Sequence, residues 1–340
     1  MNITDSRPQL KRNRFVGYQL YCPNQSEHLF EFGLRKKNQF RIAEQERPLV
    51  TVITVVRNSE STIEQCMLSV LEQTYDNIEY IIIDGGSSDG TPTLLRRYVD
   101  NIDYVVSQKD RGIYYAMNKG LSLATGDYIL FLNSDDWYTP DAVSKLINSA
   151  LKTGVDVTHA DAMLIENGQT YRMTAWLHDG LYTRGMPLRH ETMLAKSEVF
   201  VKYGVYDTSY KILADYVHLI KLYDERCTFY HVREPLLYFR STGVSYTDTV
   251  GRENERRRLF KDLFPFLDED DLALLKVRRR LSVQDRVDMI DKHQGRSELF
   301  SRSMAYNIAD CYFEEVTKNH DSNYYFRRLA RKIKTRLRKH

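Results

Sequence analysis

Residues 127–141 read Asp-Tyr-Ile-Leu-Phe-Leu-Asn-Ser-Asp-Asp-Trp-Tyr-Thr-Pro-Asp, and this stretch decides the fold. Tyr128 to Leu132 is an almost wholly apolar run of aromatic and branched side chains, which is typical of a buried parallel strand. Four polar residues follow at once, and Thr139-Pro140 then supplies an N-cap and a first-turn proline for a helix from about Asp141 to Leu151. Asp135 and Asp136 are therefore expected at the carboxyl end of a central strand, where open α/β sheets bind ligands.

The two carboxylates admit two interpretations. Hard oxygen ligands on a short turn suit Mg²⁺ or Mn²⁺, which keep few protein carboxylates and fill their other positions with water and substrate phosphates. Asp135 and Asp136 could equally cap a turn, since acidic residues often follow strands. A two-residue acidic match is a weak motif, so the choice depends on the rest of the chain.

The composition indicates a soluble globular protein. The chain has 340 residues, of which 42% are hydrophobic and 28% charged, and this length favours one large domain with appendages, or two domains. A formal net charge of +3 argues against a protein whose whole surface binds nucleic acid. The cysteines, Cys22, Cys66, Cys227 and Cys311, show no spacing of a zinc or redox motif. Because no window approaches the ~18 apolar residues of a membrane span, and the N-terminus lacks the apolar core of a signal peptide, we expect a cytoplasmic protein.

Strand and helix patterns alternate after Leu49. Four strand-like runs are each followed by a helical pattern, and four such units predict a parallel, doubly wound sheet. The runs are Val50–Val56, Tyr80–Ile83, Asp103–Ser107 and Tyr128–Leu132. Farther on, Asn167-Gly168 predicts a hairpin turn, and residues 176–192 are expected to form a loop.

We divide the chain into an N-terminal extension (1–48), a main α/β domain (49–250) and a helical C-terminal region (251–340). The last segment, 327–340, places apolar residues at helical spacing among Arg and Lys. An amphipathic basic helix of this kind could bind an anionic membrane surface, although a solvated terminus explains the same charge run.

Small and polar residues also follow the second and third strands. The run from Asp84 to Gly90 would let a ligand approach the backbone, and its first carboxylate could accept hydrogen bonds from a base or ribose. Asp110-Arg111-Gly112 places an arginine near a helix start, where it could bind a phosphate. A structural turn and a surface ion pair between Asp110 and Arg111 explain the same residues without a ligand. Neither a Gly-x-Gly-x-x-Gly fingerprint nor a P-loop occurs, so dinucleotide and P-loop chemistry lose support.

Four motifs, in this order, resemble those of the family 2 glycosyltransferases, which have a GT-A fold. They are Thr51-Val-Ile-Thr-Val-Val-Arg-Asn58, Ile83-Asp-Gly-Gly-Ser-Ser-Asp-Gly-Thr91, Asp110-Arg-Gly-Ile-Tyr-Tyr-Ala-Met-Asn-Lys-Gly120 and Phe131-Leu-Asn-Ser-Asp-Asp136. The resemblance extends to about residue 245. It implies an α/β protein with a Rossmann-like, doubly wound, mostly parallel sheet, to which the C-terminal helices form an appendage.

The resemblance also implies which residues bind the donor. The aspartate that matches Asp84 contacts the nucleotide base, usually uracil, and the carboxylate that matches Asp135 binds a metal, with Asp136 beside it. Asn133 replaces the first carboxylate of the family's Asp-x-Asp motif. The nucleotide-binding positions that the resemblance implies are Val55, Arg57, Asp84, Arg111 and Ser134.

The acceptor side is implied in the same way. Asp215, in Ala214-Asp215-Tyr216, matches the catalytic base of the family, although Ala214 replaces its usual acidic neighbour. The segment Arg189-His190-Glu191-Thr192 resembles the family's histidine-centred loop near the acceptor, and Asp110 joins Arg189 and His190 as a sugar or acceptor contact. An acidic residue at a helix start and a lone histidine also occur for purely structural reasons.

These features together predict a metal-dependent, inverting glycosyltransferase. We expect it to use Mn²⁺ or Mg²⁺ and a nucleotide-sugar donor, with a UDP-sugar favoured, and to transfer the sugar to a hydroxyl of a glycan or lipid-linked acceptor in bacterial surface polysaccharide synthesis. Such an acceptor would place the enzyme at the inner face of the plasma membrane. Two alternatives stay open: a nucleotidyltransferase, which would favour a glycine- and lysine-rich loop where Val56-Arg-Asn-Ser59 stands, and a non-catalytic nucleotide- or sugar-binding module, which Asn133 and Ala214 would suit.

Overall fold

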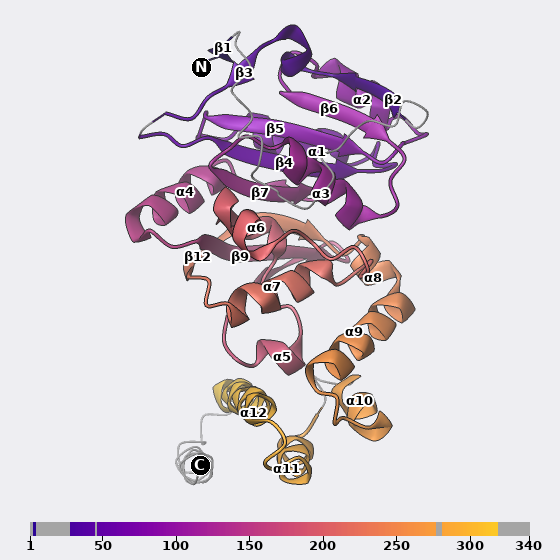
Figure 1. Cartoon of the computed structure of the whole chain (residues 1–340), viewed down its shortest axis with the longest axis vertical. Helices are drawn as coiled ribbons and strands as arrows, with labels where there is room; N and C mark the ends of the chain where they lie inside the picture. Colours follow the sequence, from indigo (N-terminus) through magenta and orange to yellow (C-terminus); the bar gives the residue numbers. More distant parts are fainter. Residues whose placement is uncertain (1–2, 5–27, 45, 277–280, 319–340) are drawn as a thin grey trace. The chain divides into compact units, whose positions relative to one another are not determined.

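The computed structural model describes residues 3–4, 28–44, 46–276 and 281–318, which belong to two compact units (Figure 1). The first unit consists of Met1–Ala175 and Leu188–Thr249, and the second of Trp176–Pro187 and Val250–His340. Residues 176–187, expected as a loop of the main domain, group with the second unit and contain a short helix, α5 (Leu181–Arg184). The three-part division of the chain drawn from the sequence remains a prediction.

A ten-stranded sheet forms the centre of the first unit. The strand order is β2-β6-β5-β4-β7-β11-β9-β12-β8, and β10 pairs with β9. The four strands nearest the candidate site run parallel to one another: β4 (Val50–Val56), β5 (Ile78–Asp84), β6 (Tyr104–Gln108) and β7 (Tyr128–Asn133). The remaining strands of the sheet are β2 (His28–Phe32), β8 (Trp137–Tyr138), β9 (Val157–Glu166), β10 (Gln169–Met173), β11 (Leu194–Lys196) and β12 (Phe229–Arg240); β1 (Ile3–Thr4) and β3 (Phe40–Arg41) pair separately.

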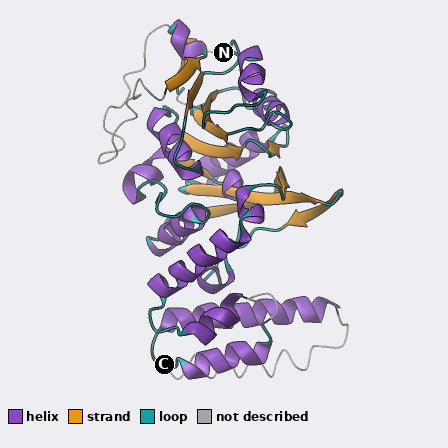
Figure 2. Cartoon of the chain, turned by 90° about the vertical axis from the view of Figure 1, so that its right-hand side faces the viewer, coloured by secondary structure: helices purple, strands orange, loops and turns teal. Residues whose placement is uncertain are grey.

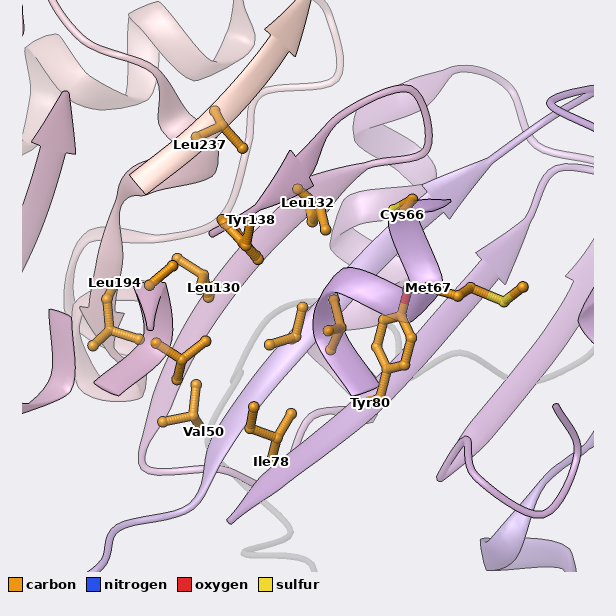
Figure 3. Packing of buried hydrophobic residues seen from close by; sticks show 14 of the residues in the cluster. Val50, Cys66, Met67, Ile78, Tyr80, Leu130, Leu132, Tyr138, Leu194 and Leu237 are labelled. Atoms are coloured by element: carbon orange, nitrogen blue, oxygen red, sulfur yellow. The ribbon is translucent and has the colours of Figure 1, made fainter. Parts of the chain in front are cut away.

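Helices cover both faces of this sheet, because the β-branched strands are apolar on both sides. On one face, Val50, Ile78 and Leu130 from three neighbouring strands share a cluster with Cys66 and Met67 of α1 (Figure 3). On the other face, α3 approaches β4 so closely that a Cβ atom on Gly120 would lie 2.4 Å from Ile53. The helices of this unit are α1 (Ile63–Leu71), α2 (Thr91–Arg97), α3 (Ile113–Leu123), α4 (Ala142–Thr153), α6 (Ser197–Tyr203), α7 (Ala214–Asp224) and α8 (Val244–Thr247), with the 3₁₀ turns η1 (Leu34–Lys37) and η2 (His190–Thr192).

The register of the parallel strands brings their last residues to one edge. Val55 of β4 pairs with Asn133 of β7, Val56 pairs with Asp84 of β5, and Asp84 pairs with Ser107 of β6. The loops that carry the sequence motifs therefore leave the sheet side by side, as the doubly wound pattern predicts. The α/β fold class is confirmed.

Two local predictions, a hairpin turn and the cap of a helix, have different outcomes. The hairpin at Asn167-Gly168 is confirmed, since both residues have positive φ, 51° and 74°, and join β9 to β10. Helix α4 was expected from about Asp141 with Thr139 as its N-cap; it begins at Ala142, and Asp141 occupies the N-cap position. The Thr139 hydroxyl donates to the Asp141 carboxylate at 2.9 Å instead of capping the helix.

Among the described residues of the second unit, the regular secondary structure is helical (Figure 2). Besides α5 they form α9 (Thr249–Leu263), α10 (Glu269–Lys276), α11 (Val283–Lys292) and α12 (Glu298–Lys318). The expected helical C-terminal region is thus present, whereas the predicted membrane-binding segment 327–340 lies outside the described residues. Among the helices that the structure describes, none has the length and apolar character needed to span a bilayer.

Candidate active site

The turn after β7 presents its two aspartates differently. Asp136 is fully buried, and its Oδ1 accepts a hydrogen bond from the backbone N–H of Arg240 at 2.9 Å. Asp135 is partly exposed, and its Oδ2 accepts from the Thr242 hydroxyl at 3.0 Å. Burial, followed by the charges of Glu191 and Asp135, raises the pKa of Asp136 well above its ordinary value. Asp136 therefore anchors the turn to the end of β12, and Asp135 is the carboxylate that a ligand can reach; Asp136 as a metal ligand stays a prediction.

Three buried acceptor oxygens at this turn, or contacting it, have no hydrogen-bond donor among the described residues. They are Asn133 Oδ1, Asp136 Oδ2 and Glu191 Oε2. Carboxylate and amide oxygens are the ligands that Mg²⁺ and Mn²⁺ prefer, so the side chains present fit a divalent cation. Within the described ranges no three His, Cys, Asp or Glu side chains form a ready-made metal cage, which leaves a cation shared with substrate phosphates as the arrangement to test.

Asp215 lies in the first turn of α7 and contacts two other elements. Its Oδ1 accepts from the hydroxyl of Tyr114, on α3, at 2.8 Å, and its Oδ2 lies 3.3 Å from Nδ1 of His190, on η2. The Asp215 side chain remains 16% exposed, so an acceptor hydroxyl can reach it. The same His190 Nδ1 lies 3.4 Å from Glu191 Oε2, and Glu191 Oε1 accepts from Asn133 Nδ2 at 2.7 Å. Polar contacts thus run without interruption from Asp215 to the β7 turn.

Asp215 and His190 favour each other's charged forms. Burial raises the pKa of Asp215, but the hydrogen bond and charge of His190, with the Tyr114 hydroxyl, leave it below its ordinary value. Burial lowers the pKa of His190, but the charges of Glu191 and Asp215 outweigh burial and leave it above its ordinary value. At neutral pH Asp215 is therefore ionised and able to accept a proton.

This ion pair predicts how stability depends on pH. Because the pKa of His190 is raised from 6.5 in the fold, its stabilisation is complete below that value and is lost as pH rises through the folded pKa. Because the pKa of Asp215 is lowered from 3.8, its stabilisation is present above that value and is lost as pH falls through the folded pKa. Without added metal, we expect the unfolding temperature of the wild type to fall more between about pH 6 and 9 than that of His190→Asn. Parallel pH profiles for the two proteins would contradict the pairing.

The predicted nucleotide residues lie along the ends of β4, β5 and β7. A Cβ atom added to Gly85, directly after Asp84, would lie 3.6 Å from both the Arg57 side chain and Asp110 Oδ2. The Ser134 hydroxyl lies 2.9 Å from that of Ser59. Arg57, Asp110 and Ser134 are thus brought to the same edge of the sheet, and Val55 is fixed there by its pairing in the strand.

Asp84 is fully buried at this edge. Its carboxylate accepts from the backbone N–H of Ser87 at 3.1 and 3.2 Å, and from the hydroxyls of Ser87 and Ser107. Asp84 therefore holds the loop after β5 in place, and its contact with a nucleotide base stays a prediction.

Two arginines predicted as substrate contacts, Arg111 and Arg189, lie in other surroundings. Arg111 is exposed just before α3. The Arg189 guanidinium lies 3.9 Å from the centre of the Phe239 ring and donates to the Tyr246 hydroxyl at 3.0 Å, so β12 and α8 fix it. Their roles toward substrate remain predictions.

Sequence reasoning missed Tyr114 and Glu191 as site residues. Both lie inside motifs that the sequence displays, but their partners Asp215 and Asn133 are 101 and 58 residues away. No pattern in the sequence signals those two contacts.

Comparisons with known proteins identify the family and the fold. The family model "Glycosyl transferase family 2" matches residues 51–228, more than half of the chain. EpsH of Bacillus subtilis, which is named as a glycosyltransferase, is 38% identical over 107 residues, and this match spans only 31% of each chain. The structure of TarS residues 1–349 from S. aureus in complex with UDP-GlcNAc superposes with a TM-score of 0.54 and 15% identity, over 80% of this chain and 92% of that one.

A second solved structure also shares the fold. The mannosyltransferase PcManGT from Pyrobaculum calidifontis, in complex with GDP-Man and Mn²⁺, gives a TM-score of 0.51 and 17% identity, over 77% of this chain and 86% of that one. At these identities the structures establish the GT-A fold, and the family model establishes the family. The chain belongs to glycosyl transferase family 2.

Proposed function

We propose that the enzyme transfers a sugar from a nucleoside diphosphate, with a UDP-sugar favoured, to an acceptor hydroxyl with inversion at the anomeric carbon. The observation that carries this proposal is the path of polar contacts from Asp215 through His190 and Glu191 to Asn133. That path joins the candidate base to the turn that contains Asp135. A base on one side of the sugar and a diphosphate site on the other is the arrangement that in-line displacement requires.

Asp215 would take the proton of the acceptor hydroxyl as the oxygen attacks the anomeric carbon. Tyr114 and His190 hold its carboxylate in place and keep it ionised. Asp135, with the donor's phosphates, would hold a divalent cation, which when bound neutralises charge on the departing diphosphate. The breaking glycosidic bond leaves its electron pair on the diphosphate, and the proton of the acceptor hydroxyl moves to Asp215.

The donor class is supported by the fold neighbours, one of which is in complex with UDP-GlcNAc and the other with GDP-Man and Mn²⁺. For the acceptor we propose a hydroxyl of a glycan or lipid-linked glycan of a bacterial surface polysaccharide. A lipid-linked acceptor would bring the enzyme to the inner face of the plasma membrane, where a basic segment such as 327–340 would help to hold it.

Incubation of the full chain with Mn²⁺ and a panel of nucleotide sugars tests this function. We expect slow release of free nucleoside diphosphate from a subset of the panel, because water replaces the acceptor, and faster release when the acceptor is added. Release of sugar 1-phosphate would instead indicate nucleotidyl transfer. Binding without either product would indicate a non-catalytic module and would overturn the proposal.

A further inference from the structure

The side chains of Asn133 and Glu191 form a buried pair. Asn133 Nδ2 donates to Glu191 Oε1 at 2.7 Å, and the Glu191 side chain is only 2% exposed. The backbone carbonyl of Glu191 accepts from the Tyr138 hydroxyl at 2.6 Å, which fixes η2 against the β7 turn. Because both ends of this contact are held by secondary structure, the amide and the carboxylate meet in a defined geometry.

Position 133 is also where this chain departs from the family's Asp-x-Asp motif. An amide there removes one negative charge from the end of β7, and the structure places another carboxylate in direct contact with that amide. An aspartate at 133 would instead put two carboxylates within hydrogen-bonding distance in a buried setting, where like charges strongly disfavour each other. The residues at 133 and 191 therefore depend on one another.

The second carboxylate oxygen of Glu191 accepts no hydrogen bond from the described residues. Oε2 is buried and has no hydrogen-bond donor among the described residues, and His190 Nδ1 lies 3.4 Å from it. Asp136 Oδ2 and Asn133 Oδ1 are unpaired in the same way. A carboxylate that only oriented His190 would leave these acceptor oxygens unpaired, whereas a divalent cation would satisfy them.

We propose that Glu191 supplies the donor site with the carboxylate charge that position 133 lacks. Asn133 and Glu191 then act as a pair in which position 133 carries the amide and position 191 the carboxylate. This inference rests on the proposed function, because it assigns Glu191 to the binding of the divalent cation with the nucleoside diphosphate. Glu191 is then a specificity-determining residue for the metal and diphosphate, contributed by η2 and not by the β7 turn.

The test is a cycle of variants in the full chain: wild type, Asn133→Asp, Glu191→Gln and the double variant that exchanges the two groups. Glu198→Gln is the matched control, since that carboxylate is exposed on α6. The measurement is Mn²⁺ affinity in the presence of UDP, by titration calorimetry, together with the unfolding temperature without metal. Glu191→Gln is expected to weaken Mn²⁺ binding by about 10- to 100-fold, and Glu198→Gln to leave it unchanged.

The double variant separates a shared charge from independent roles. Asn133→Asp alone should lower the unfolding temperature, because two carboxylates then meet, and adding Glu191→Gln should restore both that temperature and most of the Mn²⁺ affinity. Undiminished Mn²⁺ binding by Glu191→Gln, or a double variant as weak as the two single effects combined, overturns the inference. If Glu191→Gln does not fold, the Mn²⁺ affinity and unfolding temperature of the double variant alone test the inference.

The proposed function fails by a different result. A wild-type protein that neither binds Mn²⁺ with UDP nor releases nucleoside diphosphate from any donor refutes the transferase chemistry itself. A wild type that does both, with Glu191→Gln equal to it, refutes only the role of Glu191.

Discussion

Replacing Asp215 with asparagine is expected to lower kcat by about 10²–10⁴-fold, because general-base catalysis supplies a factor of that size. Asparagine keeps the shape of the side chain and can still accept from the Tyr114 hydroxyl, so the local structure should persist. It cannot take a proton. Since Asp215 acts on the acceptor, the affinity for the donor should stay close to that of the wild type. Steady-state kinetics with saturating donor, with UDP binding measured separately, will test both expectations.

Asp224→Asn is the matched control for this substitution. It makes the same chemical change at the opposite end of α7, on an exposed side chain, and should leave kcat unchanged. Full turnover by Asp215→Asn would remove Asp215 from the role of base. A loss of donor affinity equal to the loss of kcat would instead assign it to the donor side.

Asp135→Asn is expected to lower kcat/KM by about 10²-fold or more, because a bound cation contributes several kcal/mol of stabilisation to the charge on the leaving group. The Thr242 hydroxyl can still donate to the amide oxygen, so the turn should keep its shape. Unlike Asp215→Asn, this variant should also bind Mn²⁺ and UDP more weakly. Titration calorimetry and donor turnover together distinguish the two positions.

Asp141→Asn provides the comparison for Asp135. It lies six residues farther along the chain, and its carboxylate is 43% exposed and paired with Lys145 on the surface, where such pairs contribute little. Metal binding and turnover should not change in this variant. Equal Mn²⁺ affinities in wild type and Asp135→Asn would exclude Asp135 as the metal-binding carboxylate.

The sheet edge could be predicted from the sequence because its signals are local. Each parallel strand is a short apolar run with a polar loop directly after it, and parallel strands place those loops at a common edge. The observed pairing of Val55 with Asn133, and of Val56 with Asp84, agrees with this rule. Nothing beyond the order of the strands was needed to bring the four motifs together.

The contacts that make the site work are not local, and the sequence could not supply them. Tyr114 meets Asp215 across 101 residues, and Asn133 meets Glu191 across 58. Whether a buried polar side chain finds its partner depends on how α3, α7 and η2 pack, which no periodicity encodes. The start of α4 was predicted to within one residue, but its cap was not, because the Thr139 hydroxyl donates to the Asp141 carboxylate instead of capping the helix.

The contacts of residues 176–187, in the second unit, could not be predicted from the sequence either. Glycines and a proline predicted a loop, but the segment is fixed to α12. The Thr183 hydroxyl lies 2.7 Å from that of Ser303 and accepts from Asn307 Nδ2 at 2.6 Å. A segment that is loop-like in composition is therefore ordered by partners about 120 residues away.

A crystal structure of the full chain with UDP and Mn²⁺ tests the central claim most directly, namely that the β7 turn and the start of α7 line one site. We predict that Mn²⁺ and the diphosphate bind at Asp135 and that the uracil lies along the ends of β4 and β5. We also predict that Asp215 faces the β-phosphate across the space that the donor sugar would fill. A nucleotide bound away from the β7 turn, or separated from Asp215 by packed protein, would contradict the account.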